Sequence, residues 1–219
     1  MNKNNLVKRC LLLVFGLLIM AYGVSLSIKA GLGTSPISSL PYTISQLTPL
    51  SVGTATIAMH CVLILLQMLL LRRNYNPVQL LQLPVALLFG YLTDLTLMSI
   101  QYLTPGTYAE QWICCLLGVL LVGIGVSCEV NANVIPLAGE GFILAVCKIF
   151  SRPFPPVKVC FDCSLVIIAC ALGLLFRGEL IGVREGTIAA AILVGLVSKQ
   201  ITKWLIKPLI KRLWTGVDA

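Results

Sequence analysis

The chain has 219 residues, of which 58% are hydrophobic and 11% are charged. Too few polar side chains are present to cover a soluble globule of this size, so the composition predicts a membrane protein. The net charge of +8 does not indicate nucleic acid as a partner, because the lysines and arginines form short clusters between apolar runs, as orientation signals do.

Six apolar runs are long enough to cross the ~30 Å hydrocarbon core of a bilayer, which takes a helix of ~20 residues. They cover residues 10–28, 52–71, 78–100, 111–128, 157–176 and 186–205. The first run could belong to a signal peptide, but it resembles the run 111–128, which lies in the middle of the chain. We therefore treat all six as full spans.

Two further apolar stretches, residues 34–48 and 135–150, are shorter and are interrupted by proline, glycine and polar residues. Irregular backbone at membrane depth is tolerated only where protein or a wet cavity surrounds it. We therefore expect an all-α polytopic fold with six full spans and two short or re-entrant helices.

The sequence contains an internal repeat. Residues 16–31 and 118–133 align without a gap at a shift of 102 residues, with identities at Gly16/Gly118, Leu18/Leu120, Gly23/Gly125, Val24/Val126, Ser25/Ser127 and Ala30/Ala132. Farther on the shift becomes 105, with Gly90 over Gly195. This predicts two homologous repeats, residues 1–104 and 105–219, each with one short segment, and transporters built in this way bind their substrate at the repeat interface.

The paired glycines also make a packing prediction. Gly16 and Gly23, like Gly118 and Gly125, are seven residues apart and fall on one helix face. Small residues allow helices to approach closely in a membrane, so we expect the first and fourth spans to turn these faces toward other helices.

The distribution of positive charge separates two topologies. If both short segments re-enter, 13 of the 16 lysines and arginines lie in the cytoplasm and three, Lys29, Arg177 and Arg184, lie outside. If both short segments span, the split is 11 against 5. We therefore expect six crossings with both termini in the cytoplasm, which makes the second repeat inverted relative to the first.

Glu140 is the strongest candidate for a functional side chain. It lies between Gly139 and Gly141 in the second short segment, where a charge is costly in lipid. In the first short segment, Pro36 follows two hydroxyl residues, a pattern typical of a helix N-terminus that can attract anions. We expect a substrate-binding site near mid-membrane between the two segments, lined by Thr34, Ser35, Ser38, Ser39 and Glu140. The alternative is that Glu140 is structural and forms a buried ion pair with Lys158 or Arg184.

Further candidates for this site are Asp94, Asp162, Arg184 and Glu185. Asp94, the repeat equivalent of Lys199, is alternatively an interfacial residue that a neighbouring helix holds. Arg184 and Glu185 either gate an outer vestibule or begin a helix that favours an N-terminal glutamate.

No catalytic motif is present: phosphate loops, H-E-x-x-H, G-x-S-x-G and a Ser/His/Asp set are all missing from the sequence. Of the nine cysteines, Cys160 and Cys163 form a C-x-x-C, but no second pair or histidine stands near them in the sequence. We therefore expect a protein that is not an enzyme and has no cofactor or bound metal.

Four segments resemble a known family. Residues 31–39 (GLGTSPISS), 138–142 (AGEGF), 157–162 (VKVCFD) and 182–187 (GVREGT) are similar to the YczE-like group of bacterial integral membrane proteins and more loosely to the YitT-like group. The resemblance covers nearly the whole chain. It departs where Ile37 and Ser38 replace a Trp and an Asp, and where residues 138–140 replace Pro, Arg and Asp. The resemblance implies a fold but no substrate.

Together, these patterns predict a bacterial inner-membrane protein that is a small secondary transporter or exporter of an unidentified solute or ion. A substrate-binding membrane subunit of an ATP-driven transporter and a non-transporting accessory or scaffold protein are the alternatives. The partners expected are the lipid bilayer and that solute. A homodimer is compatible with so small a bundle.

Overall fold

The computed structural model describes residues 3–206 and residue 208, with side chains described from residue 6 onward. The described chain is helical, as the sequence predicts, and its elements are α1 (Lys3–Ala30), α2 (Pro36–Leu47), α3 (Val52–Leu71), η1 (Arg72–Asn74), η2 (Pro77–Leu81), α4 (Gln82–Ser99), α5 (Tyr108–Ala132), α6 (Ala138–Phe150), α7 (Phe154–Arg177), α8 (Glu185–Ile201) and the π-helical turn η3 (Thr202–Ile206).

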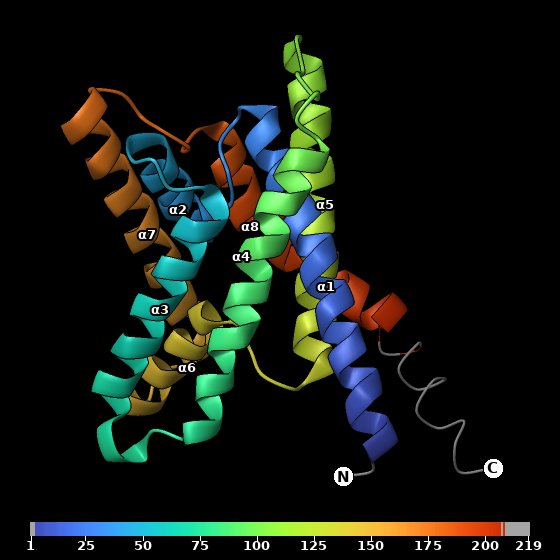
Figure 1. Ribbon diagram of the computed structural model, residues 1–219, viewed down its shortest axis with the longest axis vertical. Helices are drawn as coiled ribbons and strands as arrows, with labels where there is room; N and C mark the ends of the chain where they lie inside the picture. Colours follow the sequence, from blue (N-terminus) through green and yellow to red (C-terminus); the bar gives the residue numbers. More distant parts are fainter. Residues whose placement is uncertain (1–2, 207, 209–219) are drawn as a thin grey trace.

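Six of these helices, α1, α3, α4, α5, α7 and α8, are long and apolar enough to cross a membrane. The other two, α2 and α6, have 12 and 13 residues, which correspond to only about 18–20 Å of helix. In Figure 1 the η1 turn lies at the same end of the molecule as the start of α1. This arrangement agrees with six crossings rather than eight.

Two boundaries differ from the predicted spans in ways that matter. Proline at residue 77 starts a 3₁₀ turn, so α4 begins at Gln82 instead of residue 78. α5 continues to Ala132, four residues past the predicted end of its span, and stops where Asn133 adopts a left-handed conformation. The additional turn of α5 carries Glu129.

α1 and α5 pack side by side in opposite directions (Figure 1). A Cβ atom added at Gly16 would lie 3.0 Å from the carbonyl oxygen of Gly125, and one added at Gly23 would lie 2.7 Å from that of Gly118. Only glycine lets two backbones approach this closely. The prediction that these glycine faces meet another helix is therefore confirmed.

The two short helices meet at their N-terminal ends. A Cβ atom added at Gly139, the second residue of α6, would lie 2.5 Å from Cδ1 of Ile37, the second residue of α2. In Figure 1 α2 occupies the upper half of the molecule and α6 the lower half, so the two helices run from this meeting point toward opposite ends. Both N-termini therefore point toward the middle of the bundle.

The start of α6 is also tied to the pair α3 and α4. The amide nitrogen of Gln67 on α3 donates to Oε1 of Gln82 and to the carbonyl oxygen of Ala138, both at 3.1 Å. All three residues are buried. The first residue of the second short helix is thus fixed by the first half of the chain.

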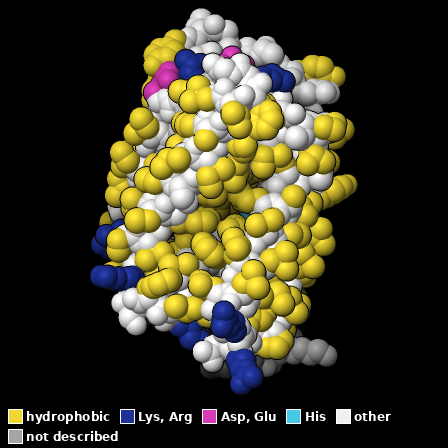
Figure 2. Space-filling model, turned by 90° about the vertical axis from the view of Figure 1, so that its left-hand side faces the viewer, with side chains coloured by type: hydrophobic (Ala, Val, Ile, Leu, Met, Phe, Trp, Pro, Cys, Tyr) yellow, Lys and Arg dark blue, Asp and Glu magenta, His cyan; other side chains and the backbone are white. Residues whose placement is uncertain are grey.

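The surface agrees with a bilayer environment. Figure 2 shows one face of the molecule, on which hydrophobic side chains cover the middle, acidic side chains lie near the top, and basic side chains lie near the top and in the lower part. A soluble domain would scatter its charges over the whole face.

Candidate functional site

A cavity with a volume of about 510 Å³ lies where α2 and α6 meet. Each of the eight α-helices contributes to its wall, and most of the lining side chains are apolar, such as Met20, Phe89, Val122, Ile143 and Val194. A cavity of this size and lining is typical of a site that takes a small organic molecule.

Glu140 lines this cavity from the first turn of α6. It forms no ion pair with Lys158 or Arg184, because Lys158 pairs with Asp162 and Arg184 pairs with Glu185. The ion pair that the structural alternative requires is therefore not formed. Lys158 is still close enough to Glu140 to attract its carboxylate electrostatically.

Glu129, on the last turn of α5, is the second glutamate of the cavity. It is only 4% exposed, and its Oε1 accepts a hydrogen bond of 2.7 Å from the backbone N–H of Leu137, the residue that precedes α6. Glu129 and Glu140 are close enough to repel each other when both are charged. The two carboxyl groups therefore flank the N-terminus of α6.

Lys158 and Asp162 face the cavity from one side of α7 and form an ion pair of 3.1 Å across one helical turn. The Lys158 side chain is 41% exposed and that of Asp162 is 18% exposed. Such an i, i+4 pair contributes little to stability, about 0.3–0.5 kcal/mol. Its main effect is to occupy the one basic side chain that lines the cavity among the described residues.

His60 is the titratable group that α3 adds to the cavity wall. It is 1% exposed, and its ring stands edge-on to Phe89 with 6.3 Å between the ring centroids. Its Nδ1 has no hydrogen-bond partner. An unpaired buried polar atom of this kind costs about 1–3 kcal/mol.

The first short helix contributes hydroxyl groups instead of carboxylates. Ser35 is the N-cap residue of α2 and Pro36 is its first helical residue, as predicted, but the Ser35 hydroxyl donates to Oγ of Ser38 at 3.0 Å and caps no backbone group. Both serines line the cavity. Ser38 and Glu140, which the predicted repeat would make equivalent, thus face the same space.

The structure separates the other predicted site residues from this cavity. Ser39 is buried and donates to the carbonyl oxygen of Pro36 at 2.7 Å. Asp94 caps the start of α3 by accepting hydrogen bonds from the Gly53 N–H at 2.7 Å and the Ser51 hydroxyl at 2.6 Å. The structure therefore agrees with the alternative for Asp94, in which a neighbouring helix holds this residue. Glu185 lines neither pocket and pairs with Arg184 at 3.5 Å.

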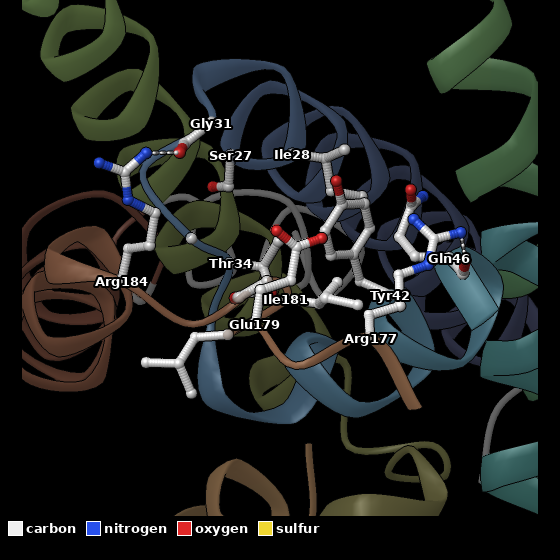
Figure 3. A pocket seen from close by; sticks show the side chains of 13 residues that line it. Ser27, Ile28, Gly31, Thr34, Tyr42, Gln46, Arg177, Glu179, Ile181 and Arg184 are labelled. Carbon is white, nitrogen blue, oxygen red and sulfur yellow. Dashed lines mark hydrogen bonds between the residues drawn. The ribbon is translucent and has the colours of Figure 1, made fainter. Parts of the chain in front are cut away.

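Thr34 and Arg184 belong to a second, outer pocket of about 270 Å³ (Figure 3). The Arg184 guanidinium donates to the carbonyl oxygen of Gly31 at 3.0 Å, and that of Arg177 donates to the carbonyl oxygen of Gln46 at 2.7 Å. Figure 3 shows these two arginines at opposite edges, with Glu179 between them. Arg184 is also the N-cap residue of α8, whose first residue is Glu185, as the alternative described, and the gating role of these two residues stays a prediction.

A thin wall separates the outer pocket from the cavity. Thr34 lines the pocket while Ser35, the next residue, lines the cavity. The wall is held by the segment between α7 and α8: the carbonyl oxygen of Gly182 accepts from the Thr34 N–H at 3.0 Å, and that of Ile181 accepts from the Thr43 hydroxyl at 2.9 Å. The backbone at Thr34 and Ser35 thus lies between the pocket and the cavity.

Sequence reasoning missed Glu129 and His60. Glu129 fell one residue beyond the predicted span 111–128, so it was not weighed as a charge within the membrane. The signal that could have found it is the same one that identified Glu140, an acidic residue within an otherwise apolar helix. His60 carried no sequence pattern that separates a cavity residue from a core residue.

The fold and the cavity define a multi-pass helical membrane protein. The chain belongs to a family of unknown function, DUF6198, whose model matches residues 7–203.

Two bacterial relatives are similar over most of their length. The chain is 28% identical to "Uncharacterized protein YyaS" of Bacillus subtilis (strain 168) over 186 residues, which cover 83% of this chain and 86% of the relative. It is 27% identical to an "Uncharacterized protein" of Haemophilus influenzae (strain ATCC 51907 / DSM 11121 / KW20 / Rd) over 186 residues, or 85% and 79% of the two chains. No solved structure matches the chain. These descriptions name neither the YczE-like nor the YitT-like group, so that resemblance stays a prediction.

Proposed function

We propose that the protein is a small secondary transporter or exporter that binds its substrate in the 510 Å³ cavity between α2 and α6. The observation that carries the proposal is the pair Glu129 and Glu140, two carboxyl groups on the cavity wall without an ion-pair partner among the described residues. Ionisable groups at this depth are costly and are typical of substrate and proton pathways.

The arrangement of the helices supports an inverted repeat. α1 and α5, the equivalent first spans of the two copies, pack antiparallel, and Gly16 faces Gly125 as Gly23 faces Gly118. A pseudo-two-fold axis in the membrane plane relates such contacts, and it also relates two short helices that point their N-termini at each other. In transporters of this build, one copy moves against the other around a fixed site.

The orientation that goes with this proposal puts both termini in the cytoplasm of a bacterium, in its inner membrane. Asn74 and Thr104 are exposed at opposite ends of α4 and its flanking turns. The two cysteines are introduced one at a time into a cysteine-free variant of the protein. In whole cells, Asn74→Cys should resist an impermeant thiol reagent and Thr104→Cys should react with it. Ready labelling of Asn74→Cys together with protection of Thr104→Cys would show that the protein has the opposite orientation.

We further propose that a proton on the glutamate pair is coupled to substrate binding. The titratable groups that face the pair are Lys158 and Asp162 from α7 and His60 from α3, while α1, α2, α4 and α8 contribute none to the cavity wall among the described residues. A carboxyl group that holds a proton in one state and releases it when substrate binds would link the two events.

The experiment is a thermal-shift screen of the purified protein against metabolites and ions at two pH values, followed by flux measurements on the compounds that stabilise it. Stabilisation and flux should depend on pH in the parent and lose that dependence in Glu140→Gln, whose amide is nearly isosteric and cannot titrate. Flux by the protein alone in liposomes would exclude an ATP-driven partner.

The opposite result is equally clear. Removing one member of a buried ion pair costs about 3–5 kcal/mol of stability. If Glu140→Gln melts far below the parent and Lys158→Gln restores its stability, Glu140 is structural. If no compound stabilises the parent and no flux is found, the protein is not a transporter, and the accessory or scaffold role takes its place.

A further inference from the structure

We infer that the cavity binds a hydrophobic amine as its protonated cation, and that this ligand enters from the bilayer between α7 and α8. The inference rests on the proposed function and names the substrate class of the same site.

The charges of the cavity wall favour a cation. Three carboxyl groups, those of Glu129, Glu140 and Asp162, face one ammonium group, that of Lys158. Asp162 already pairs with Lys158 at 3.1 Å, so the two glutamates are left without a cationic partner. A buried carboxyl group becomes stable either by taking up a proton or by pairing with a cation. A cationic ligand supplies the second state.

The helix dipoles oppose this preference but do not decide it. The N-termini of α2 and α6 carry partial positive charge, which favours anions by about 0.3–1 kcal/mol, up to about 2 in partly buried positions. At α6 the protein already supplies the anions, because Glu129 accepts from the Leu137 N–H and Glu140 lies in the first helical turn. The two full negative charges outweigh the partial positive charge of the helix N-terminus. The part of the cavity next to α6 is therefore negatively charged when both glutamates are ionised.

The glutamates also indicate that the cation donates hydrogen bonds. Carboxylate oxygens are acceptors, and an ammonium group carries N–H donors. A protonated amine therefore both pairs with and hydrogen-bonds to the carboxylates, whereas a quaternary ammonium interacts with them by charge alone.

The walls and the opening indicate that the rest of the ligand is apolar. α7 and α8 both line the cavity, through residues that include Phe154 and Ala191, yet they make at most a marginal contact with each other in the described chain. A Cβ atom added at Gly195, on the cavity wall, would meet no atom within 4 Å. We therefore assign the entry route of an apolar molecule from the bilayer to the gap between these two helices.

The test compares four ligands with one carbon skeleton: 4-phenylbutylammonium, its N,N,N-trimethyl derivative, 4-phenylbutanol and 4-phenylbutyrate. Binding to the full chain in lipid nanodiscs is measured with empty nanodiscs as the blank for lipid partition. We expect the primary ammonium to bind at least about tenfold more tightly than the alcohol and the carboxylate, as is typical of a charge-assisted hydrogen bond. Equal binding of the cation and the alcohol, or tighter binding of the carboxylate, would overturn the inference.

Variants assign the binding to the named groups. Glu129→Gln and Glu140→Gln should each weaken binding of the primary ammonium by about tenfold and leave binding of the alcohol unchanged. The trimethyl derivative should bind more weakly than the primary ammonium on the parent protein, because it donates no hydrogen bond to either carboxylate. A variant that no longer folds is recognised because it binds none of the four ligands. In that case the comparison of the four ligands on the parent protein still tests whether the cavity prefers a protonated amine.

The entry route has its own variant pair. Gly195→Phe places a ring at the gap and should slow association of the primary ammonium by about tenfold or more, while Ile192→Phe, at an exposed α8 position that does not line the cavity, should leave it unchanged. Unchanged association in Gly195→Phe would refute the lateral route. If none of the amines binds but the thermal-shift screen finds another pH-dependent ligand, this inference fails and the proposed function stands.

Discussion

The pairs α3–α4 and α7–α8 occupy corresponding places in the two halves of the chain, but only the first pair is closed. Within the most apolar window of each helix, 44% and 33% of the residues of α3 and α4 are buried, against 17% and 6% for α7 and α8. At the first pair Gly53 and Gly90 bring the backbones together, whereas a Cβ atom added at Gly195 on α8 would meet no atom within 4 Å.

This difference suggests that the two helix pairs have different roles around the cavity. α3 and α4 form a rigid pair that also holds the start of α6 through Gln67 and Gln82. α7 and α8 both line the cavity but make at most a marginal contact with each other in the described chain. Elements with few buried contacts are those that move most easily. We therefore expect motion around the cavity to involve α7 and α8 first.

The largest effect should appear where the two halves are alike. Gly23→Leu and Gly125→Leu each place a side chain against backbone atoms of the α1–α5 contact, at 2.6 Å from the Val122 nitrogen and 2.7 Å from the Gly16 oxygen respectively. Backbone cannot yield as a side chain can, so each should lower stability by about 1–3 kcal/mol, at the upper end of overpacking costs. Thermal melting in detergent measures this, and clearly unequal losses would contradict the symmetry of the contact.

The next prediction breaks the symmetry directly. Gly90→Leu should lower stability by about 1–3 kcal/mol, because its Cβ atom would lie 2.6 Å from the Gly53 oxygen. Its repeat equivalent, Gly195→Leu, meets open space and should melt within about 0.5 kcal/mol of the parent. A similar loss in both variants would show that α7 and α8 pack as closely as α3 and α4.

Asp94 sharpens the comparison at the ends of the helices. Asp94→Asn removes the charge from two hydrogen bonds that tie α4 to the start of α3, and hydrogen bonds to charged groups contribute about 1.5–3 kcal/mol. Since the amide keeps one acceptor, we expect a loss of about 1–2 kcal/mol. Lys199→Gln, at the equivalent and exposed position on α8, should change stability by less than about 0.5 kcal/mol. Chemical denaturation of both variants checks the difference.

The smallest effect is expected at the ion pair of α7. Asp162→Asn breaks a pair whose lysine is 41% exposed and which links residues of one helix only, so the loss should stay below about 1 kcal/mol. Ligand affinity is the more sensitive measurement, because the variant releases Lys158 toward Glu140 and should weaken binding of a cation. A stability loss larger than that of Asp94→Asn would mean that Asp162 holds a second helix.

Much of the architecture was predictable from the sequence. Long apolar runs determine six spans by their length alone, and proline and glycine reveal the two short helices because they interrupt such runs. Gly16 and Gly23 indicated a helix contact through their spacing, and Glu140 stood out because a carboxylate in an apolar segment is expensive. Each of these signals is local, so no knowledge of the packing was needed.

What the tertiary structure decided concerns residues far apart in the chain. Only the packing of α5 against the start of α6 shows that Glu129 and Glu140 share one cavity, and only the packing of α4 against α3 shows that Asp94 caps a helix instead of lining that cavity. The open pair α7–α8 follows from contacts that do not form. The physical reason is that hydrophobic pattern specifies whether a helix is buried in lipid or protein, whereas the angle and depth at which helices cross decide which polar groups meet.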